Sequence, residues 1–233
     1  MKHIIAFVAG VFTLVSTDLL ADQSVYINQT SGENLSVTIS QSNGNGNIVA
    51  ASGDLSGVDS YFVMNGDDQT WIVDQIGSAN VLSGSVISSD MFNFTLNQFG
   101  DNNEIDILGN IANFADLNLS YTGNNNTMVL DLGGAASASY TNLDWIVTGD
   151  YNTVVNNISA DGALQDIDVS GSYNAFQIDQ TGYGDSIDFH EIYLDMIGDN
   201  NQVDIMQDTT LAAGHIDLVI NGSNAVIDIT QSD

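Results

Sequence analysis

One short pattern recurs along the chain and limits the folds that are open to it. The segment NQFGDNNEIDIL at 97–108 returns as DMIGDNNQVDIM at 195–206, each with a Gly-Asp-Asn-Asn turn before an alternating segment. Related turns follow one another about every 23 residues. A fixed period of this length is the signature of a repeat protein. The turn glycines are Gly32, Gly53, Gly77, Gly100, Gly123, Gly149, Gly171, Gly198 and Gly222.

A second set of turn-like segments lies roughly midway between these glycines, for example SSD at 88–90 and GN at 109–110. The segments between the turns are short, and Ser, Asn, Gly and Asp bound them as turns require. Each repeat is therefore predicted to contain two strands and two turns. About nine such repeats fill residues 22–233, so we expect a single repeat domain without a linker.

Side chains alternate between the two faces of a strand, which predicts the face that each residue joins. One face is apolar and is closed by Asn or Gln near the turns, and the opposite face carries aspartates such as Asp106, Asp166 and Asp204. A two-stranded unit cannot bury an apolar face alone, but stacked units can. We therefore predict an all-β fold, a β-solenoid with two strands per rung. Three inward sets are Phe92, Phe94, Leu96, Gln98, Asn103, Ile105 and Ile107; Gln165, Ile167, Val169, Asn174, Phe176, Ile178 and Gln180; and Ile192, Leu194, Met196, Asn201, Val203, Ile205 and Gln207.

Amides rather than charges occupy the inward polar positions. Stacked Asn and Gln side chains can pair their amides from rung to rung, which satisfies buried polar groups that would otherwise cost about 1–3 kcal/mol each. We expect these amides and turn glycines to be structural. The amides are Gln29, Asn34, Gln41, Gln75, Asn80, Gln98, Asn103, Asn126, Asn152, Asn174, Gln180, Asn201, Gln207, Asn224 and Gln231.

The first 21 residues are predicted to be a secretory signal peptide. Lys2 precedes the apolar run IIAFVAGVFTLV at 4–15, which is too short to span a bilayer comfortably, and Ala21 is a plausible last residue before cleavage. We therefore expect the protein to be secreted, at the cell surface or outside the cell, with no membrane insertion. Cleavage would remove Lys2 and Asp18, leaving 29 acidic residues and no Lys or Arg.

This charge balance excludes several partners. Nucleic acids bind through cationic side chains, which the mature chain lacks, so nucleic acid is not expected to bind. The chain also has no cysteine, which excludes disulfides, thiolate metal sites and a cysteine nucleophile. Cations, neutral polysaccharides and further copies of the chain remain as partners.

The repeat resembles that of the curlins, the secreted subunits of curli, which are functional amyloid fibres on bacterial surfaces. The resemblance lies in Gln, one residue, Gly, two residues, Asn and an alternating segment that ends in Gln, covering about residues 24–231 as a pattern. QIGSAN at 75–80 and QFGDNN at 98–103 match the first part, and NAFQIDQ at 174–180 and NQVDIMQ at 201–207 match the second. The sequence departs from the pattern where Tyr121, Val147, Val169 and Met196 replace the first glutamine. The resemblance implies a solenoid that joins end to end into fibres.

The sequence gives little support for a catalytic function. His190, beside Glu191 in a segment that resembles a bulge, and His215 are both expected to face solvent. The pair Asp166 and Asp168 shares a face, but such carboxylates occur on nearly every strand and specify no catalytic site, so we do not expect an enzyme.

Calcium is a better candidate ligand than a substrate. Asp54, Asp101, Asp150 and Asp199 each follow a turn glycine, and hard cations bind carboxylate oxygens. Other residues intervene on the rungs between them, and the calcium-binding nonapeptide repeat is missing. We therefore expect no cofactor, and cations that screen the surface rather than fill ordered sites.

The sequence predicts a structural subunit that assembles with itself. Unpaired strand edges at the two ends of a solenoid can template the strands of another chain. The resulting fibre would serve a biofilm matrix and surface adhesion, with a nucleating protein and an export machinery left open as partners. The alternative is a monomeric secreted solenoid adhesin that binds glycans or calcium. The end rungs would offer Val25, Ile27, Gln29, Leu35, Val37, Ile39 and Gln41 at one end, and Ile216, Leu218, Ile220, Ile227, Ile229 and Gln231 at the other.

Overall fold

Strands make up the whole regular structure of the described chain. A computed structural model describes residues 2–7, 11–16, 23–29, 36–41, 48–50, 62–65, 67–77, 81–100, 102, 104–132, 140–182, 190–209 and 214–232. These residues form the strands β1 to β18, and every pairing between them is parallel. The described residues include no helix long and apolar enough to cross a membrane.

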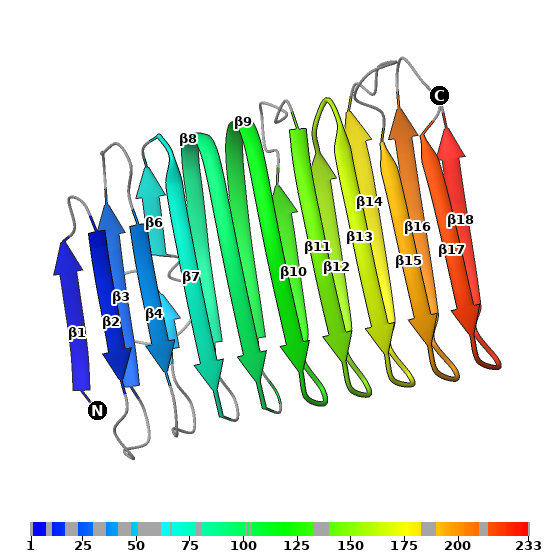
Figure 1. Ribbon diagram of the computed structural model, residues 1–233, viewed down its shortest axis with the longest axis horizontal. Helices are drawn as coiled ribbons and strands as arrows, with labels where there is room; N and C mark the ends of the chain where they lie inside the picture. The colour runs from blue at the N-terminus through cyan, green and yellow to red at the C-terminus, as the bar shows by residue number, and fades with distance from the viewer. Residues whose placement is uncertain are drawn as a thin grey trace.

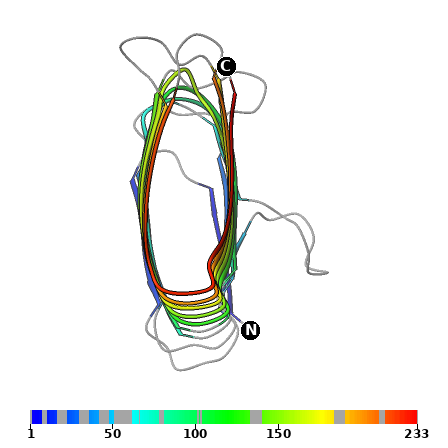
Figure 2. The same ribbon diagram turned by 90° about the vertical axis from the view of Figure 1, so that its right-hand side faces the viewer.

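The strands wind about one long axis as a β-solenoid, so the all-β solenoid fold predicted from the repeat is confirmed. Successive strands follow one another from end to end of the molecule (Figure 1), and the end view outlines a flattened loop with two long sides (Figure 2). We call these sides sheet 1 and sheet 2. Sheet 1 contains β2 (Val11–Ser16), β4 (Ser36–Gln41), β7 (Gln69–Ile76), β11 (Tyr140–Thr148), β13 (Ala163–Ser170), β15 (Glu191–Ile197) and β17 (His215–Asn221).

Sheet 2 lies on the other side of the loop. It shares two long strands with sheet 1, because the first part of β8 (Val81–Phe99) and of β9 (Glu104–Thr122) pairs in sheet 2 and the last part pairs in sheet 1. The other strands of sheet 2 are β1 (Lys2–Phe7), β3 (Gln23–Gln29), β5 (Ile48–Ala50), β6 (Phe62–Asn65), β10 (Thr127–Leu132), β12 (Thr153–Ser159), β14 (Ala175–Gly182), β16 (Gln202–Thr209) and β18 (Val226–Ser232).

The register between neighbouring strands stacks equivalent repeat positions into columns. Phe176 of β14, for example, pairs with Val154 of β12 on one side and Val203 of β16 on the other. Paired strands lie about 4.8 Å apart, so each column places like side chains in van der Waals contact along the axis. Inward and outward positions therefore stay separate over many rungs.

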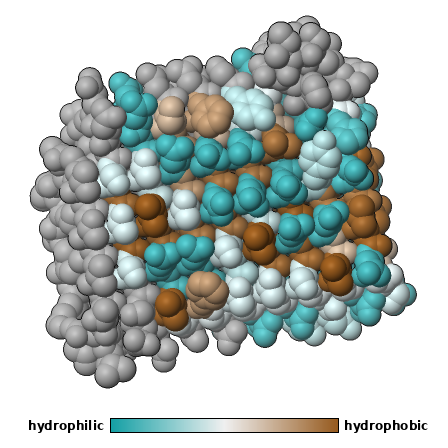
Figure 3. Space-filling view, viewed as in Figure 1, coloured by the Kyte–Doolittle hydropathy of each residue, from teal (hydrophilic) through white to brown (hydrophobic). Residues whose placement is uncertain are grey.

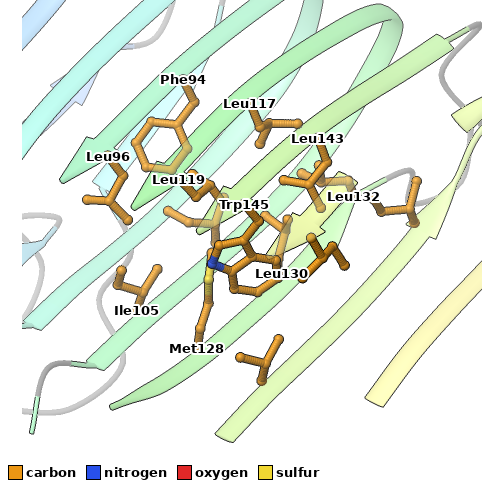
Figure 4. Close-up of a cluster of buried hydrophobic side chains, with 14 of the residues drawn as sticks. Phe94, Leu96, Ile105, Leu117, Leu119, Met128, Leu130, Leu132, Leu143 and Trp145 are labelled. Atoms are coloured by element: carbon orange, nitrogen blue, oxygen red, sulfur yellow. The ribbon is translucent and has the colours of Figure 1, made fainter. Parts of the chain in front are cut away.

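The core is the inward half of these columns. Every described member of the three predicted inward sets is buried, which confirms the assignment made from alternation. Trp145 of β11 packs at the centre among Leu117, Leu119 and Leu130, and these side chains come from both sheets (Figure 4). Two edge-to-face contacts join Trp71 to Phe92 and Phe94, with ring centroids 5.0 and 5.8 Å apart.

The turns predicted at 88–90 and 109–110 do not end a strand. β8 and β9 continue through these positions, and the pairing between them shifts register between Ile87 and Ser89 and again between Ser89 and Met91. Small residues at such irregularities allow a strand to bend without losing its neighbours. Here the chain passes from sheet 2 to sheet 1 by bending (Figure 1).

The first predicted turns are out of phase with the structure. Gln41, rather than Gln29, pairs in the column of Gln75, so β4 and not β3 is the strand equivalent to β7. Gly32 lies in the sequence between β3 of sheet 2 and β4 of sheet 1, whereas Gly77 follows a strand of sheet 1. Both Gly32 and Gly53 lie outside the described residues. The cause is the segment 51–61, which separates β5 from β6 although both pair with the same neighbours, β3 and β8.

The predicted signal peptide contains the first two strands. β1 pairs with β3, from Lys2 beside Gln23 to Phe7 beside Asn28. β2 pairs with β4, from Val11 beside Ser36 to Ser16 beside Gln41. Cleavage after residue 21 would therefore take one strand from each sheet and leave β3 and β4 as the first strands.

The outer faces carry many carboxylates, together with exposed hydrophobic side chains such as Ile146, Ile197 and Val219. On the face drawn in the space-filling view, hydrophilic bands that cross the strands alternate with hydrophobic ones (Figure 3). In sheet 1, Asp144 pairs with Asp166 and Asp168 pairs with Asp195, so like charges lie side by side. The pKa of Asp166 is raised by partial burial first, and then by the charges of Asp168, Asp144 and Asp195. Neighbouring carboxylates of this kind repel other negatively charged surfaces.

Candidate functional site

Among the described strands, the C-terminal end of the solenoid is open. β17 pairs only with β15 and β18 only with β16, so among the described strands nothing lies beyond them. Both strands therefore present a row of backbone donors and acceptors at the end of the molecule. Such an edge can template the strand of another chain unless charge, proline or a covering element prevents it.

Inward side chains at this end are exposed because no further rung covers them. Ile227 and Ile229 of β18 are 44% and 43% exposed, whereas Val203 and Ile205 of β16, in the same columns, are at most 1% exposed. In β17 the inward residues Ile216, Leu218 and Ile220 are only partly buried against the core. β17 and β18 therefore have the same core face as the internal strands, but among the described residues a neighbouring strand covers them on one side only.

An amide contact extends to the end of one column. Gln231 Nε2 donates to Gln207 Oε1 at 2.9 Å and also to the carbonyl oxygen of Gly214. Further along the axis, Gln98 Nε2 donates to Gln75 Oε1 at 2.7 Å across neighbouring rungs of sheet 1. The side chains of Gln29 and Gln41 are not among those that the structure describes.

The asparagines of the turns bond mainly to the backbone of the neighbouring rung. Asn152 Oδ1 accepts from the Asn126 backbone N–H at 3.2 Å, and Asn174 Oδ1 and Asn201 Oδ1 accept from the backbones of Asn152 and Asn174 in turn, each at 3.0 Å. Amide-to-amide contact is added between Asn152 Nδ2 and Asn174 Oδ1. In the last turn Asn224 stands outside this ladder, exposed and with a φ of 58°. Asn34, Asn80 and Asn103 lie outside the described residues.

The turn glycines allow the closest approach between rungs. Gly77, Gly100, Gly123, Gly149, Gly171 and Gly198 all have positive φ, and a Cβ at any of the last five would overlap the carbonyl oxygen of the preceding turn glycine. Gly222 is equally close to the carbonyl of Gly198. Glycine is required here for both the backbone angle and the space.

The calcium candidates within the described residues are used as turn acceptors. Asp150 Oδ1 accepts from the Ser172 backbone N–H at 2.6 Å, and Asp199 Oδ1 accepts from the backbone N–H and hydroxyl of Ser223. These hydrogen bonds to Ser223 lower the pKa of Asp199. Asp54 and Asp101 lie outside the described residues, and within those residues no group of three or more His, Asp or Glu side chains is arranged to hold a metal ion.

A buried polar network inside the solenoid was not anticipated. Asn156 Nδ2 donates to Gln165 Oε1 at 2.6 Å, and Gln165 Nε2 donates to Gln180 Oε1 at 3.1 Å, so the chain of contacts crosses from sheet 2 to sheet 1 and back. Gln180 Nε2 then donates to the Ala163 carbonyl at 2.8 Å and lies 3.0 Å from His190 Nδ1. Asn156, Gln165, Gln180 and His190 are all fully buried.

The prediction of a solvent-facing His190 is wrong. Counting back in twos along the strand would have found it, since Leu194 and Ile192 face inward and His190 continues the alternation. Because the Gln180 amide nitrogen can only donate, Nδ1 of His190 accepts, which requires a neutral ring. Burial lowers the pKa of His190, against smaller opposing contributions from the Gly182 backbone and Asp161. His215 is exposed as expected, with its ring 5.5 Å from that of Tyr193.

Replacing Gln165 by leucine should destabilise the fold by about 2 kcal/mol, because Asn156 Nδ2 and Gln180 Oε1 would each lose a buried partner. Urea unfolding measures the change. The matched control is Gln177→Leu, an exposed glutamine whose amide donates to Asp179 on the outer face and whose loss should change stability by less than about 0.5 kcal/mol. Equal losses of stability in the two variants would show that the buried network does not stabilise the fold more than an exposed hydrogen bond does.

Stability should fall as the pH is lowered through the range in which histidine titrates. The unfolded chain takes up a proton at His190 near its ordinary pKa of 6.5, whereas the folded chain, with a lowered pKa, does so only at lower pH. The free energy of unfolding should therefore decline, by about 1.4 kcal/mol for each pH unit that separates the pKa of His190 in the folded chain from that in the unfolded chain. Urea unfolding between about pH 7.5 and pH 5.5 should show this slope, and His190→Gln should be flatter. A variant with the wild-type slope would contradict the assignment.

Comparisons of the whole chain with protein-family models, with curated proteins and with solved structures gave no significant match. The resemblance to the curlins therefore rests on the repeat residues themselves.

Proposed function

We propose that the chain is a secreted structural subunit that assembles end to end into extracellular, curli-like fibres of a biofilm matrix. The observation that carries the proposal is the open C-terminal end, where two strand edges and the inward residues Ile227 and Ile229 are exposed. Outer faces that repeat carboxylates oppose side-by-side contact, which leaves growth along the axis as the favoured route. The curlin-like repeat points to the same function.

The finer architecture that we propose is a rung of two strands, one in each sheet. From the β2–β3 pair to the β17–β18 pair this gives nine rungs in the full chain, with β5 and β6 together forming one strand of the second rung. Removal of residues 1–21 would leave eight complete rungs and β3. Each rung then adds the same columns to both sheets, and β3 adds one further strand to sheet 2.

The columns specify how two subunits would meet. Following the register along sheet 1, Val37 of β4 belongs to the column of Ile216, Ile39 to that of Leu218 and Gln41 to that of Ile220. Along sheet 2, Gln29 of β3 belongs to the column of Gln231. A second copy could place β3 on β18 in parallel register. Because sheet 2 then has one strand more than sheet 1, one strand position of sheet 1 would stay open between β17 and β4 of the next copy.

Negative-stain microscopy and fibre diffraction of the chain beginning at Asp22, with and without millimolar calcium, test this function. Unbranched fibres with a reflection at about 4.8 Å would support it. Faster growth with calcium would support screening of the aspartates as a condition for assembly. A stable monomer under all conditions would count against fibre assembly and favour the alternative, a monomeric adhesin whose acidic faces bind calcium or glycans, to be measured by calorimetry.

The predicted signal peptide should suppress assembly while it remains attached. In the full chain β1 occupies the edge of β3 onto which the preceding copy would add, and β2 occupies the edge of β4. We expect the chain that keeps residues 1–21 to elongate seeds at least about tenfold more slowly than the chain beginning at Asp22, a difference of about 1.4 kcal/mol in the elongation step. Equal rates in seeded thioflavin assays would show that β1 and β2 do not protect this end.

A further inference from the structure

Two exposed tyrosines lie stacked on neighbouring turns. The rings of Tyr151 and Tyr173 have centroids 5.1 Å apart and an interplanar angle of 7°. Their exposed fractions are 56% and 52%, so solvent and small reagents can reach both phenols. The outer edge of the solenoid thus carries a pair of parallel aromatic rings that the assembly argument does not use.

The backbone holds this pair in register. Tyr151 and Tyr173 have a φ of 63° each, in the left-handed region, whereas asparagine stands at the equivalent place in the turns at Asn102, Asn125 and Asn200. Asparagine tolerates this conformation better than a bulky residue does. Backbone hydrogen bonds fix both turns: the Tyr151 N–H donates to the Ser172 carbonyl and the Tyr173 N–H to the Asp199 carbonyl, each at 3.1 Å.

The pair is distinct among the tyrosines whose side chains the structure describes. Tyr121 is buried, and its ring centroid lies 6.1 Å from that of Trp145. Tyr140 stacks on Phe114, and Tyr193 meets His215 at an edge. Within that set, two phenols face each other only at Tyr151 and Tyr173.

We propose that Tyr151 and Tyr173 form a dityrosine site, a covalent cross-link between two rungs of a chain that has no cysteine. Each phenol gives one electron and one proton to a one-electron oxidant of the peroxidase and hydrogen peroxide class. The two phenoxyl radicals join through the ring carbons next to their oxygens, and the hydrogens on those carbons move to the oxygens, which restores both phenols. The pair loses two hydrogen atoms, and one peroxide becomes two waters.

Proximity gives this coupling its selectivity. A phenoxyl radical at Tyr151 has its partner in ring contact, which raises the effective concentration far above that of a phenol on another molecule. Both side chains lie on the surface, where they can tilt from the stacked arrangement to the angle that the new carbon–carbon bond needs. The product would close the chain between Tyr151 and Tyr173 without altering either sheet.

The test treats the full chain, dilute and monomeric, with a peroxidase and hydrogen peroxide. Cleavage at aspartate separates the two tyrosines, because Asp161, Asp166 and Asp168 lie between them. A joined peptide two hydrogens lighter than its parts, with dityrosine fluorescence, is the expected result. Tyr151→Phe and Tyr173→Phe keep the ring stack and should lower the yield at least about tenfold, while Tyr193→Phe should leave it unchanged.

Two outcomes would overturn the proposal. One is a dityrosine that maps to other tyrosines or persists in the Tyr151→Phe and Tyr173→Phe chains. The other is an equal yield of the joined peptide when the chain is unfolded in urea before oxidation, since the cross-link would then owe nothing to the fold. A yield at least about tenfold higher in the folded chain, together with a higher urea midpoint after oxidation, supports it.

Discussion

Substitution of Gly123 by alanine is expected to cost more than about 4 kcal/mol of folding stability, a loss that single substitutions reach only through a specific structural conflict. The φ of Gly123 is 148°, and an added Cβ would overlap the carbonyl oxygen of Gly100 on the neighbouring rung. The methyl group cannot be relieved by a side-chain rotation, because the obstructing atom belongs to the backbone. The two turns would have to separate, and the hydrogen bond from the Gly100 N–H to the Thr122 carbonyl would lengthen.

Urea unfolding of the Gly123→Ala chain measures this loss. Thr122→Ala is the matched control, since Thr122 is the preceding residue and its side chain is exposed on the outer face. Its substitution should change stability by less than about 0.5 kcal/mol. A Gly123→Ala chain within about 1 kcal/mol of wild type would show that the rungs can separate at this turn without penalty.

Placing a lysine at Ile229 is expected to stop growth at the C-terminal end of the fibre. Ile229 is 43% exposed in the single chain, but it lies in the column of Ile205 and would be covered by β3 of the next subunit. Burial of an unpaired ammonium there costs several kcal/mol. A penalty of about 3 kcal/mol corresponds to a loss of roughly a hundredfold in elongation. Because the residue is half exposed before assembly, the stability of the monomer should change little.

The control is Thr230→Lys, on the next residue of β18 but on the outer face. It should leave the elongation rate within about threefold of wild type, since its charge remains in water. The Ile229→Lys chain keeps its N-terminal end, so it should add once to a growing wild-type fibre and then terminate it when present as a minor component. If both lysines block growth equally, subunits meet through their faces. If neither does, the proposed junction is wrong.

Alternation in the sequence determined the larger part of the core. Residues such as Phe94, Ile178 and Leu194 were assigned inward because strand side chains alternate, and all three are buried. The rule works well here because parallel rungs in register keep each position on the same face from one rung to the next. The same logic applied to residue 190 would have placed His190 inside, but the apolar Phe189 and Ile192 suggested a bulge.

A repeat pattern does not predict contacts between the two sheets. Gln165 and Gln180 were each predicted to face inward, yet their contact with each other depends on which residues of sheet 1 lie opposite which residues of sheet 2. The sequence predicts that amides pair along the solenoid axis, whereas the Gln165–Gln180 contact runs across the core from one sheet to the other. A periodic sequence specifies neighbours along the axis and carries little information about neighbours across the core.

The positions of the first turns were predicted wrongly for a different reason. Spacing between glycines measures chain length, and the segment 51–61 lies in the sequence between β5 and β6, which pair with the same two neighbours, β3 and β8. Gly53 therefore resembled the turn of a complete repeat. The stronger indicator was Gln41, which the register aligns with Gln75 and Gln98.

The break between β5 and β6 offers a position for adding sequence to the protein. Ala50 ends β5 and Phe62 begins β6, and the pairing with β3 and β8 resumes where it stopped. The solenoid therefore already accommodates extra residues between two neighbouring positions of one strand. A peptide epitope or a small binding domain introduced between Ala50 and Phe62 would be carried once per subunit, so a fibre built from such chains would present it at regular intervals along its length.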